Sequence, residues 1–192
     1  MADVAVQLIV GLGNPGPDYE TTRHNAGFWF VEHLANRFNG QFRKEAKFSG
    51  EACKVRIAGE DVWLLKPTTF MNRSGQAVRQ ISNFYKIPVE AILVAHDELD
   101  LDPGTVRLKR GGGHGGHNGL RDLVSHMGKD FARLRIGVGH PGHKDKVVNF
   151  VLARAGKQEQ QQIDEAIDEA ISVIDDIVSG QFQKAMNQLH TR

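Results

Sequence analysis

Short apolar runs alternate along this sequence with longer stretches in which apolar residues recur every three or four positions. The runs Val6–Val10, Ile92–Ala95 and Leu134–Val138 are rich in β-branched residues and stop at glycine or polar residues, as buried strands do. The stretches between them have the apolar periodicity of amphipathic helices. Strands that alternate with helices predict an α/β fold, here a single twisted, mostly parallel mixed sheet with helices on both faces.

Further segments complete this prediction. A hairpin is expected from Glu51–Ile57 and Asp61–Leu65, turning at Gly59, and Thr105–Lys109 is expected to pair beside Ile92–Ala95. No linker, repeat or low-complexity segment interrupts the pattern, so residues 1–192 are predicted to form one domain. Helices are predicted near Asn25–Phe38, Ala77–Tyr85, Leu120–Met127 and Lys146–Leu152, followed by one long amphipathic helix through Ile163–Val178.

Composition and cysteine usage exclude several classes of protein. With 40% hydrophobic and 24% charged residues, the chain has the composition of an ordinary globular protein. Its N-terminus lacks the basic region and apolar run of a signal peptide, and no apolar stretch approaches the roughly 20 residues that span a bilayer. The single Cys53 cannot form an internal disulfide and is interpreted as a small apolar residue in a strand. A cytoplasmic protein is therefore expected.

Charge is unevenly distributed, although the formal net charge is only +1. Residues 107–146 contain nine Lys and Arg against three acids, a local charge of +6. Residues 157–179 contain one Lys against seven acids, a local charge of −6. A concentrated basic segment favours a polyanionic partner, of which nucleic acid is the commonest, and the alternative is a solvated surface.

Polar residues follow the predicted strands, and in an open α/β sheet the working surface lies beyond the carboxyl ends of the strands. The first strand leads on to His24, and the strand Ile92–Ala95 ends directly before His96 and Asp97. His24 and Asp97 make the most economical catalytic pair. A carboxylate that accepts from one imidazole nitrogen leaves the other free to deprotonate a water or hydroxyl. Taken singly, His24 also fits a capping or surface histidine, and Asp97 a turn residue.

Two glycine-rich loops invite comparison with phosphate-binding loops. Gly11–Gly16 fits G-x-G-x-x-G, but Pro15 removes an amide donor and no helix starts for about eight residues, so no cofactor is predicted. The second loop begins at Gly111 and leads into a helix near Asn118, whose free N–H groups suit an anion. The alternative for this second loop is a mobile segment without a ligand.

Other chemistries have weaker support in the sequence. Ser74 and Cys53 are conceivable covalent nucleophiles, but neither lies in a nucleophile-elbow context. No metal is predicted, because the best candidate set has spacings that match no ligand motif. That set is His96, Asp97, His114 and His117.

Three asparagines, Asn14, Asn72 and Asn118, each lie in a loop beside the end of a predicted element. Singly, each is most simply a turn or cap residue. Together they offer uncharged donors and acceptors to an amide-bearing substrate and its developing oxyanion.

Long motifs of this sequence resemble those of bacterial peptidyl-tRNA hydrolases, in the same order and at similar spacing over nearly the whole chain. No motif position departs from the family pattern. The motifs are Gly11–Gly16 with Tyr19, Thr22–Gly27, Lys66–Asn72, His96–Asp100, Gly111–Gly119, Arg133–Gly139 and Val147–Leu152.

The resemblance implies a monomeric, metal-independent esterase that releases tRNA from peptidyl-tRNA dropped by ribosomes. By motif, His24 resembles the general base that activates water, and Asp97 its orienting partner. Asn14 resembles the residue that helps select a peptide-bearing amino group, and we expect it to accept a hydrogen bond from the substrate amide N–H. The remaining expected contacts are Tyr19, Phe70, Asn72 and Asn118 to the peptide and the tRNA 3′ end, and Arg107, Lys109, Arg135 and Lys144 to tRNA phosphates. The alternatives are a non-catalytic RNA-binding module and a metal-dependent hydrolase.

Overall fold

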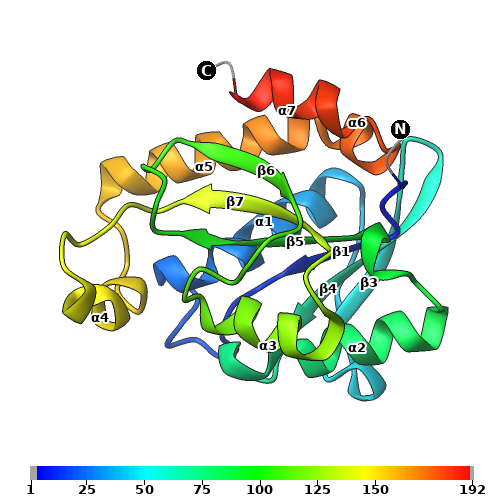
Figure 1. Ribbon diagram of the computed structural model, residues 1–192, viewed down its shortest axis with the longest axis horizontal. Helices are drawn as coiled ribbons and strands as arrows, with labels where there is room; N and C mark the ends of the chain where they lie inside the picture. Colours follow the sequence, from blue (N-terminus) through cyan, green and yellow to red (C-terminus); the bar gives the residue numbers. More distant parts are fainter. Residues whose placement is uncertain (1–3, 191–192) are drawn as a thin grey trace.

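A computed structural model describes residues 4–190, and its centre is a seven-stranded mixed sheet in the order β2-β3-β4-β1-β5-β7-β6 (Figure 1). The predicted single mixed sheet is confirmed. Its four inner strands run parallel to one another. They are β4 (Glu60–Pro67), β1 (Leu8–Gly11), β5 (Ile92–Glu98) and β7 (Ala132–Gly137).

Antiparallel strands complete both margins of the sheet. β3 (Gly50–Ile57) forms the predicted hairpin with β4, and the short polar β2 (Arg43–Glu45), which the sequence did not predict, pairs with β3. At the other margin, β6 (Val106–Arg110) pairs antiparallel with β7.

The position of β6 corrects one prediction, because this strand lies beside β7 and not beside Ile92–Ala95. The physical reason is the length of the connections. The seven residues between β5 and β6 are enough for an antiparallel connection to the position next but one, whereas a parallel neighbour of β5 has to follow a connection of a dozen residues or more. The longer connection through α3 lets β7 take the place next to β5.

The carboxyl end of β6 therefore lies at the opposite end of the sheet from the carboxyl ends of β1 and β5. The glycine-rich loop at residues 111–117 has to return along the sheet before α3 begins. Four of its glycines have positive φ, a conformation that other residues rarely adopt. The glycines of this loop are therefore explained by the backbone conformation that the loop adopts.

Helices cover both faces of the sheet, as predicted. α1 (Ala26–Arg37), α5 (Lys157–Ser172), α6 (Ile174–Val178) and α7 (Phe182–His190) pack on one face, in a cluster with Ile9 and Leu93. α2 (Ser74–Tyr85) and α3 (Asn118–Met127) pack on the other, with Leu8 and Val10 (Figure 1). α4 (Val147–Val151) and short 3₁₀ turns at Arg23–Asn25, Ala46–Phe48, Met71–Arg73, Val89–Ala91 and Lys144–Lys146 complete the described elements.

The predicted long C-terminal helix is wrong in one respect, because it is divided. α5 ends at Ser172, where Val173 leaves the helical conformation with φ −110° and ψ 12°. Gly180, with φ +85°, then separates α6 from α7. The bends keep the apolar residues Ile174 and Ile177 buried against the sheet. Within residues 4–190, no helix is both long and apolar enough to cross a membrane.

Two glycines let α1 lie directly on the sheet. A Cβ atom at Gly27 would lie 2.3 Å from the carbonyl oxygen of Ala95, and one at Gly11 would lie 2.2 Å from the carbonyl oxygen of Gly27. Gly13 likewise accommodates the ring of Phe28. The first glycine-rich motif therefore serves close packing, which brings the segment preceding α1 over the end of β5.

The outer edge of β6 is covered by the end of α7. The main-chain N–H of Leu108 donates to Nε2 of His190 at 3.1 Å, and the guanidinium of Arg107 donates to the carbonyl of Leu189. Burial and the nearby charges of Arg107 and Arg135 lower the pKa of His190, which favours the neutral ring that accepts this bond.

Candidate active site

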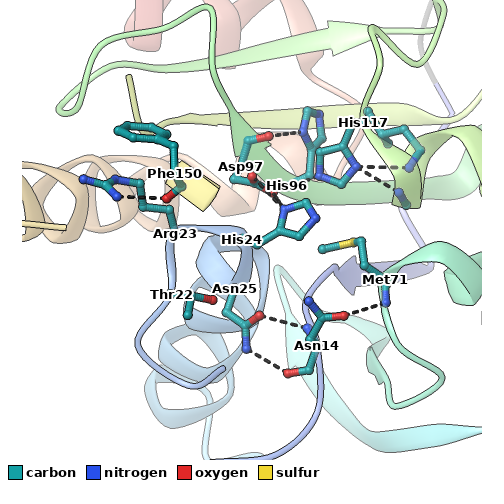
Figure 2. A network of polar contacts seen from close by, with 12 residues as sticks. Asn14, Thr22, Arg23, His24, Asn25, Met71, His96, Asp97, His117 and Phe150 are labelled. Atoms are coloured by element: carbon teal, nitrogen blue, oxygen red, sulfur yellow. Dashed lines mark hydrogen bonds and ion pairs between the residues drawn. The ribbon is translucent and has the colours of Figure 1, made fainter. Parts of the chain in front are cut away.

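His24 and Asp97 lie in direct contact, as the sequence predicted, although 73 positions separate them. His24 lies in the 3₁₀ turn before α1, and Asp97 lies near the carboxyl end of β5. The Nδ1 atom of His24 is 3.0 Å from Oδ1 and 2.9 Å from Oδ2 of Asp97 (Figure 2). Asp97 is 4% exposed, so this carboxylate is held away from solvent by its partners.

A second imidazole, that of His117, shares the same carboxylate. Its Nε2 is 2.8 Å from Oδ1 of Asp97, and its Nδ1 accepts from the main-chain N–H groups of Gly119 and Leu120 at the start of α3. Because Nδ1 accepts, Nε2 carries the proton and donates to Asp97. The sequence suggested His117 only as a metal ligand. Its place directly before a helix is the signal that could have indicated an N-cap.

Charges and hydrogen bonds fix the protonation of this centre. Burial alone would raise the pKa of Asp97, but the two imidazoles hold it far below its usual range, so the group stays a carboxylate. Burial opposes protonation of His24, yet the charge and hydrogen bond of Asp97 outweigh that effect and raise the pKa of His24 above 6.5. His24 therefore has the raised basicity that a general base gains from a carboxylate partner.

Asn14 is held by a network on the other side of His24 (Figure 2). Its Oδ1 accepts from the main-chain N–H of Met71 at 2.7 Å. Its main-chain N–H donates to Oδ1 of Asn25, and Nδ2 of Asn25 donates back to its carbonyl. Figure 2 shows the Nδ2 atom of Asn14 directed toward His24. The side chain thus presents a donor to the centre. Asn25 therefore positions the main chain of Asn14, a role that the sequence did not indicate.

The loop that supplies Met71 is strained at Phe70, which has φ +64° although it is not glycine. Such a conformation costs on the order of 1–3 kcal/mol and persists only where neighbouring contacts enforce it. The ring of Phe70 is 51% exposed and meets Tyr19 edge-to-face at 6.2 Å. These two predicted contacts lie together, but neither lines the cavity beside His24.

A cavity of about 600 Å³ opens at the His24–Asp97 pair. The predicted residues Asn14, Asn72, Asn118 and Lys144 all line it, and so does α4. His96 lies deeper in its wall, where burial lowers the pKa of His96 to about 4. The cavity therefore combines a base, its carboxylate, amide groups and a neutral buried histidine.

Comparison with known proteins assigns this arrangement to a family. The sequence profile of the family described as peptidyl-tRNA hydrolase matches residues 8–192. The chain belongs to the peptidyl-tRNA hydrolase family. It is 60% identical to the peptidyl-tRNA hydrolase of Acinetobacter baylyi over 185 residues, 96% of each chain, and 59% identical to that of Halorhodospira halophila, covering 96% of this chain and 95% of that one.

Solved structures agree with this assignment and with the fold. A crystal structure of peptidyl-tRNA hydrolase from Acinetobacter baumannii superposes with a TM-score of 0.94 at 57% identity, covering 96% of this chain and 94% of that one. An arginine-to-glutamine mutant of the same protein gives a TM-score of 0.96 at 55% identity, covering 98% and 96%. All residues of the site described above lie within the part that matches the family.

In this family member, the four predicted phosphate-binding residues lie in two places. Arg107, Lys109 and Arg135 project from β6 and β7 on the face opposite α5, because the alternate residues Val106, Leu108 and Leu134 are buried on the α5 side. Lys144 lies apart from them on the cavity wall.

Two of these four cations are already engaged within the chain. Nε of Arg135 is 2.9 Å from Oε1 of Glu98, and Glu98 lines the cavity. The guanidinium of Arg107 contacts the carbonyls of Val106 and Leu189. Lys109 and Lys144 are exposed and make the more accessible pair.

A possible metal-ligand set differs from the one suggested by the sequence. Among the described residues, His24, Asp97 and His117 bring one ligand atom each within 4.8 Å of one another. Two imidazoles and a carboxylate are donors that zinc accepts. In the geometry present, however, both imidazole nitrogens that face Asp97 lie at hydrogen-bond distance from its oxygens. The prediction of a metal-free site therefore remains a prediction that chelation can test.

Proposed function

We propose that this chain hydrolyses the ester bond between a peptide and tRNA, with His24 as the general base and Asp97 as its orienting partner. The observation that carries the proposal is the buried His24–Asp97 pair at the wall of a cavity lined by asparagines, in a member of the peptidyl-tRNA hydrolase family. The relatives named above are called peptidyl-tRNA hydrolases. We also propose that the protein acts as a monomer in the cytoplasm.

The reaction follows from the tautomer of His24. Nδ1–H donates to Asp97, so the lone pair of Nε2 is available to take a proton from water. The water oxygen then bonds to the ester carbonyl carbon, and the carbonyl oxygen becomes an oxyanion. When the tetrahedral intermediate collapses, the bond to the tRNA oxygen breaks and the proton on His24 passes to that leaving oxygen. An ester is activated relative to an amide, so no covalent enzyme intermediate is needed.

Asn14 provides a basis for selecting peptide-bearing tRNA. From the sequence we expected it to accept from the substrate amide. With Oδ1 bonded to Met71, Nδ2 is the group presented to the cavity, and we now propose that it donates to a substrate carbonyl. A free α-amino group is charged near neutral pH and offers only donors, which an amide N–H repels. The acylated amine brings a peptide carbonyl that accepts the bond.

The remaining roles divide between the cavity and the outer strands. Asn72 and Asn118, exposed on the cavity wall, are proposed to bind the peptide and the tRNA 3′ end. The Tyr19–Phe70 pair is proposed to extend this surface beside the cavity. For the tRNA phosphates we propose contacts with Arg107, Lys109, Arg135 and Lys144.

The decisive experiment compares peptidyl-tRNA with unblocked aminoacyl-tRNA and follows tRNA release from each. We expect turnover of the first, little of the second, and neither with His24→Ala. Binding of both substrates without turnover would support the RNA-binding alternative. Equal turnover of both would contradict the selection proposed for Asn14.

A further inference from the structure

Arg23, the residue directly before His24, is buried and connects the catalytic segment to the end of α4. Its guanidinium Nη1 donates to the carbonyl of Phe150 at 2.9 Å and approaches that of Ala153 at 3.4 Å (Figure 2). Its main-chain N–H also donates to the carbonyl of Ala153, at 3.1 Å. One residue thus contacts two carbonyls at the C-terminal end of α4.

The chemistry of this contact explains why an arginine is used. The carbonyl of Phe150 also accepts from the main-chain N–H of Ala153, and its second lone pair can take a charge-assisted hydrogen bond from the guanidinium. The planar guanidinium reaches both carbonyls and lies 3.8 Å over the ring of Phe150. Glu159 of α5 is 3.8 Å from Nη2, which makes this ion pair long and secondary to the carbonyl contacts.

The segment that Arg23 holds is one wall of the reaction cavity. Val148 and Leu152 line the cavity and are 66% and 40% exposed, a high exposure for apolar side chains. Val151 completes the wall. At the other end of this wall, the 3₁₀ turn that leads into α4 begins with Lys144. The apolar face is therefore placed where the substrate groups next to the scissile ester would cover it.

We propose that Arg23 is a positioning residue that fixes the α4 wall relative to His24, so that the apolar side chains of α4 contact the substrate beside the ester. The inference rests on the proposed function, because it concerns the substrate of the same site. It assigns Arg23 to substrate binding and not to proton transfer, since the imidazole of His24 is oriented by its hydrogen bond with Asp97. Loss of Arg23 lowers the fraction of molecules in which the wall is in place, and the apparent affinity falls with that fraction.

The test uses Arg23→Met, which keeps the length of the side chain but removes the charge and donors, and Arg23→Lys, which keeps the charge. Arg37→Gln, on the exposed side of α1, is the control for loss of a positive charge. We expect Arg23→Met to raise KM about tenfold on full peptidyl-tRNA, the factor that corresponds to about 1.4 kcal/mol. A peptide ester of a short 3′ fragment should show the same rise. The value of kcat and its pH profile should change little, Arg23→Lys should be intermediate, and Arg37→Gln should resemble the wild type.

Hydrogen exchange of the α4 amides provides a readout that is independent of turnover. We expect faster exchange at residues 147–152 in Arg23→Met and unchanged exchange in α2. Unchanged KM with intact folding, or faster exchange throughout the protein and not only in α4, would overturn the proposal, because Arg23 would then contribute only to stability. A fall in kcat with constant KM would also overturn it, since Arg23 would act through His24. Arg23→Lys decides the question if Arg23→Met does not fold.

Wild-type turnover is measured first, so that failure of the proposed function is seen separately. If the wild type does not cleave peptidyl-tRNA, the proposed function fails, whatever the behaviour of Arg23. If it does, and both variants have normal KM, only the inference about Arg23 fails.

Discussion

The substitution Asp97→Asn changes one atom of the centre and has a consequence that the geometry specifies. The carboxylate offers acceptors to two imidazoles, whereas an amide offers one acceptor oxygen and one donor group. His117 is fixed as a donor, because its Nδ1 accepts from Gly119 and Leu120. The amide oxygen is therefore expected at the Oδ1 position, which is 2.8 Å from His117.

The amide nitrogen then replaces Oδ2, the atom 2.9 Å from Nδ1 of His24. A donor at that position favours the tautomer in which Nδ1 of His24 accepts and Nε2 carries the proton. That tautomer cannot take a proton from water through Nε2. We therefore expect the plateau value of kcat to fall by most of the general-base contribution, about 10²–10⁴-fold, or about 3–5 kcal/mol in activation free energy.

The pH profile adds a second, independent expectation. The base is active when neutral, so in the wild type kcat/KM rises with pH through the pKa of His24, which Asp97 raises above 6.5. Without the charge of Asp97, burial remains as the leading influence and lowers that pKa. The acidic limb should therefore move to lower pH in Asp97→Asn, while the plateau falls.

The assay is kcat/KM on peptidyl-tRNA across the acidic limb and the plateau, for wild type, Asp97→Asn and Asp100→Asn. Asp100 is an exposed carboxylate on the same cavity wall and serves as the matched control. A plateau loss below about threefold would refute the argument about the tautomer of His24. An acidic limb that moves to higher pH would refute the argument that the charge of Asp97 raises the pKa of His24.

Three further predictions concern the base, metal and tRNA contacts. His24→Ala should reduce kcat about 10²–10⁴-fold with tRNA binding largely intact, and retention of more than about a third of kcat would remove His24 from the role of base. Activity should survive exhaustive chelation; a loss that zinc restores would identify His24, Asp97 and His117 as a metal centre. Neutralising Arg135 or Lys144 should raise KM on full peptidyl-tRNA and flatten the log–log salt dependence by roughly 0.7–0.9 per phosphate contact, with little change on the short 3′ ester. An equal loss on that ester would place these side chains at the reaction centre.

The part of the site that the sequence predicted depends on strand ends. His24 and Asp97 follow strands that became the neighbours β1 and β5, so placing both after buried runs was enough to bring them together. The glycines at Gly11 and Gly27 were recognised as part of a motif. Their physical purpose, a helix packed directly on the sheet, is visible only in the fold.

The part that the sequence missed depends on the direction of β6 and on individual hydrogen bonds. Apolar periodicity does not distinguish a parallel from an antiparallel strand, so the return of the glycine-rich loop and the contact of His117 with Asp97 were not foreseen. The orientation of Asn14 depends on the main chain of Met71, which follows a residue with positive φ that no local propensity favours.

The end of α7 covers the outer edge of β6, so this edge stays uncovered in the growing chain until α7 has been synthesised. Leu108 and His190 are 82 positions apart, and at about 5–20 residues per second the ribosome needs roughly 4–16 s to add the covering residue. During that interval the strand exposes an unpaired edge on which another chain could add a strand. The charged residues Lys109 and Arg110 on this strand then oppose such pairing between nascent chains, before α7 closes the edge.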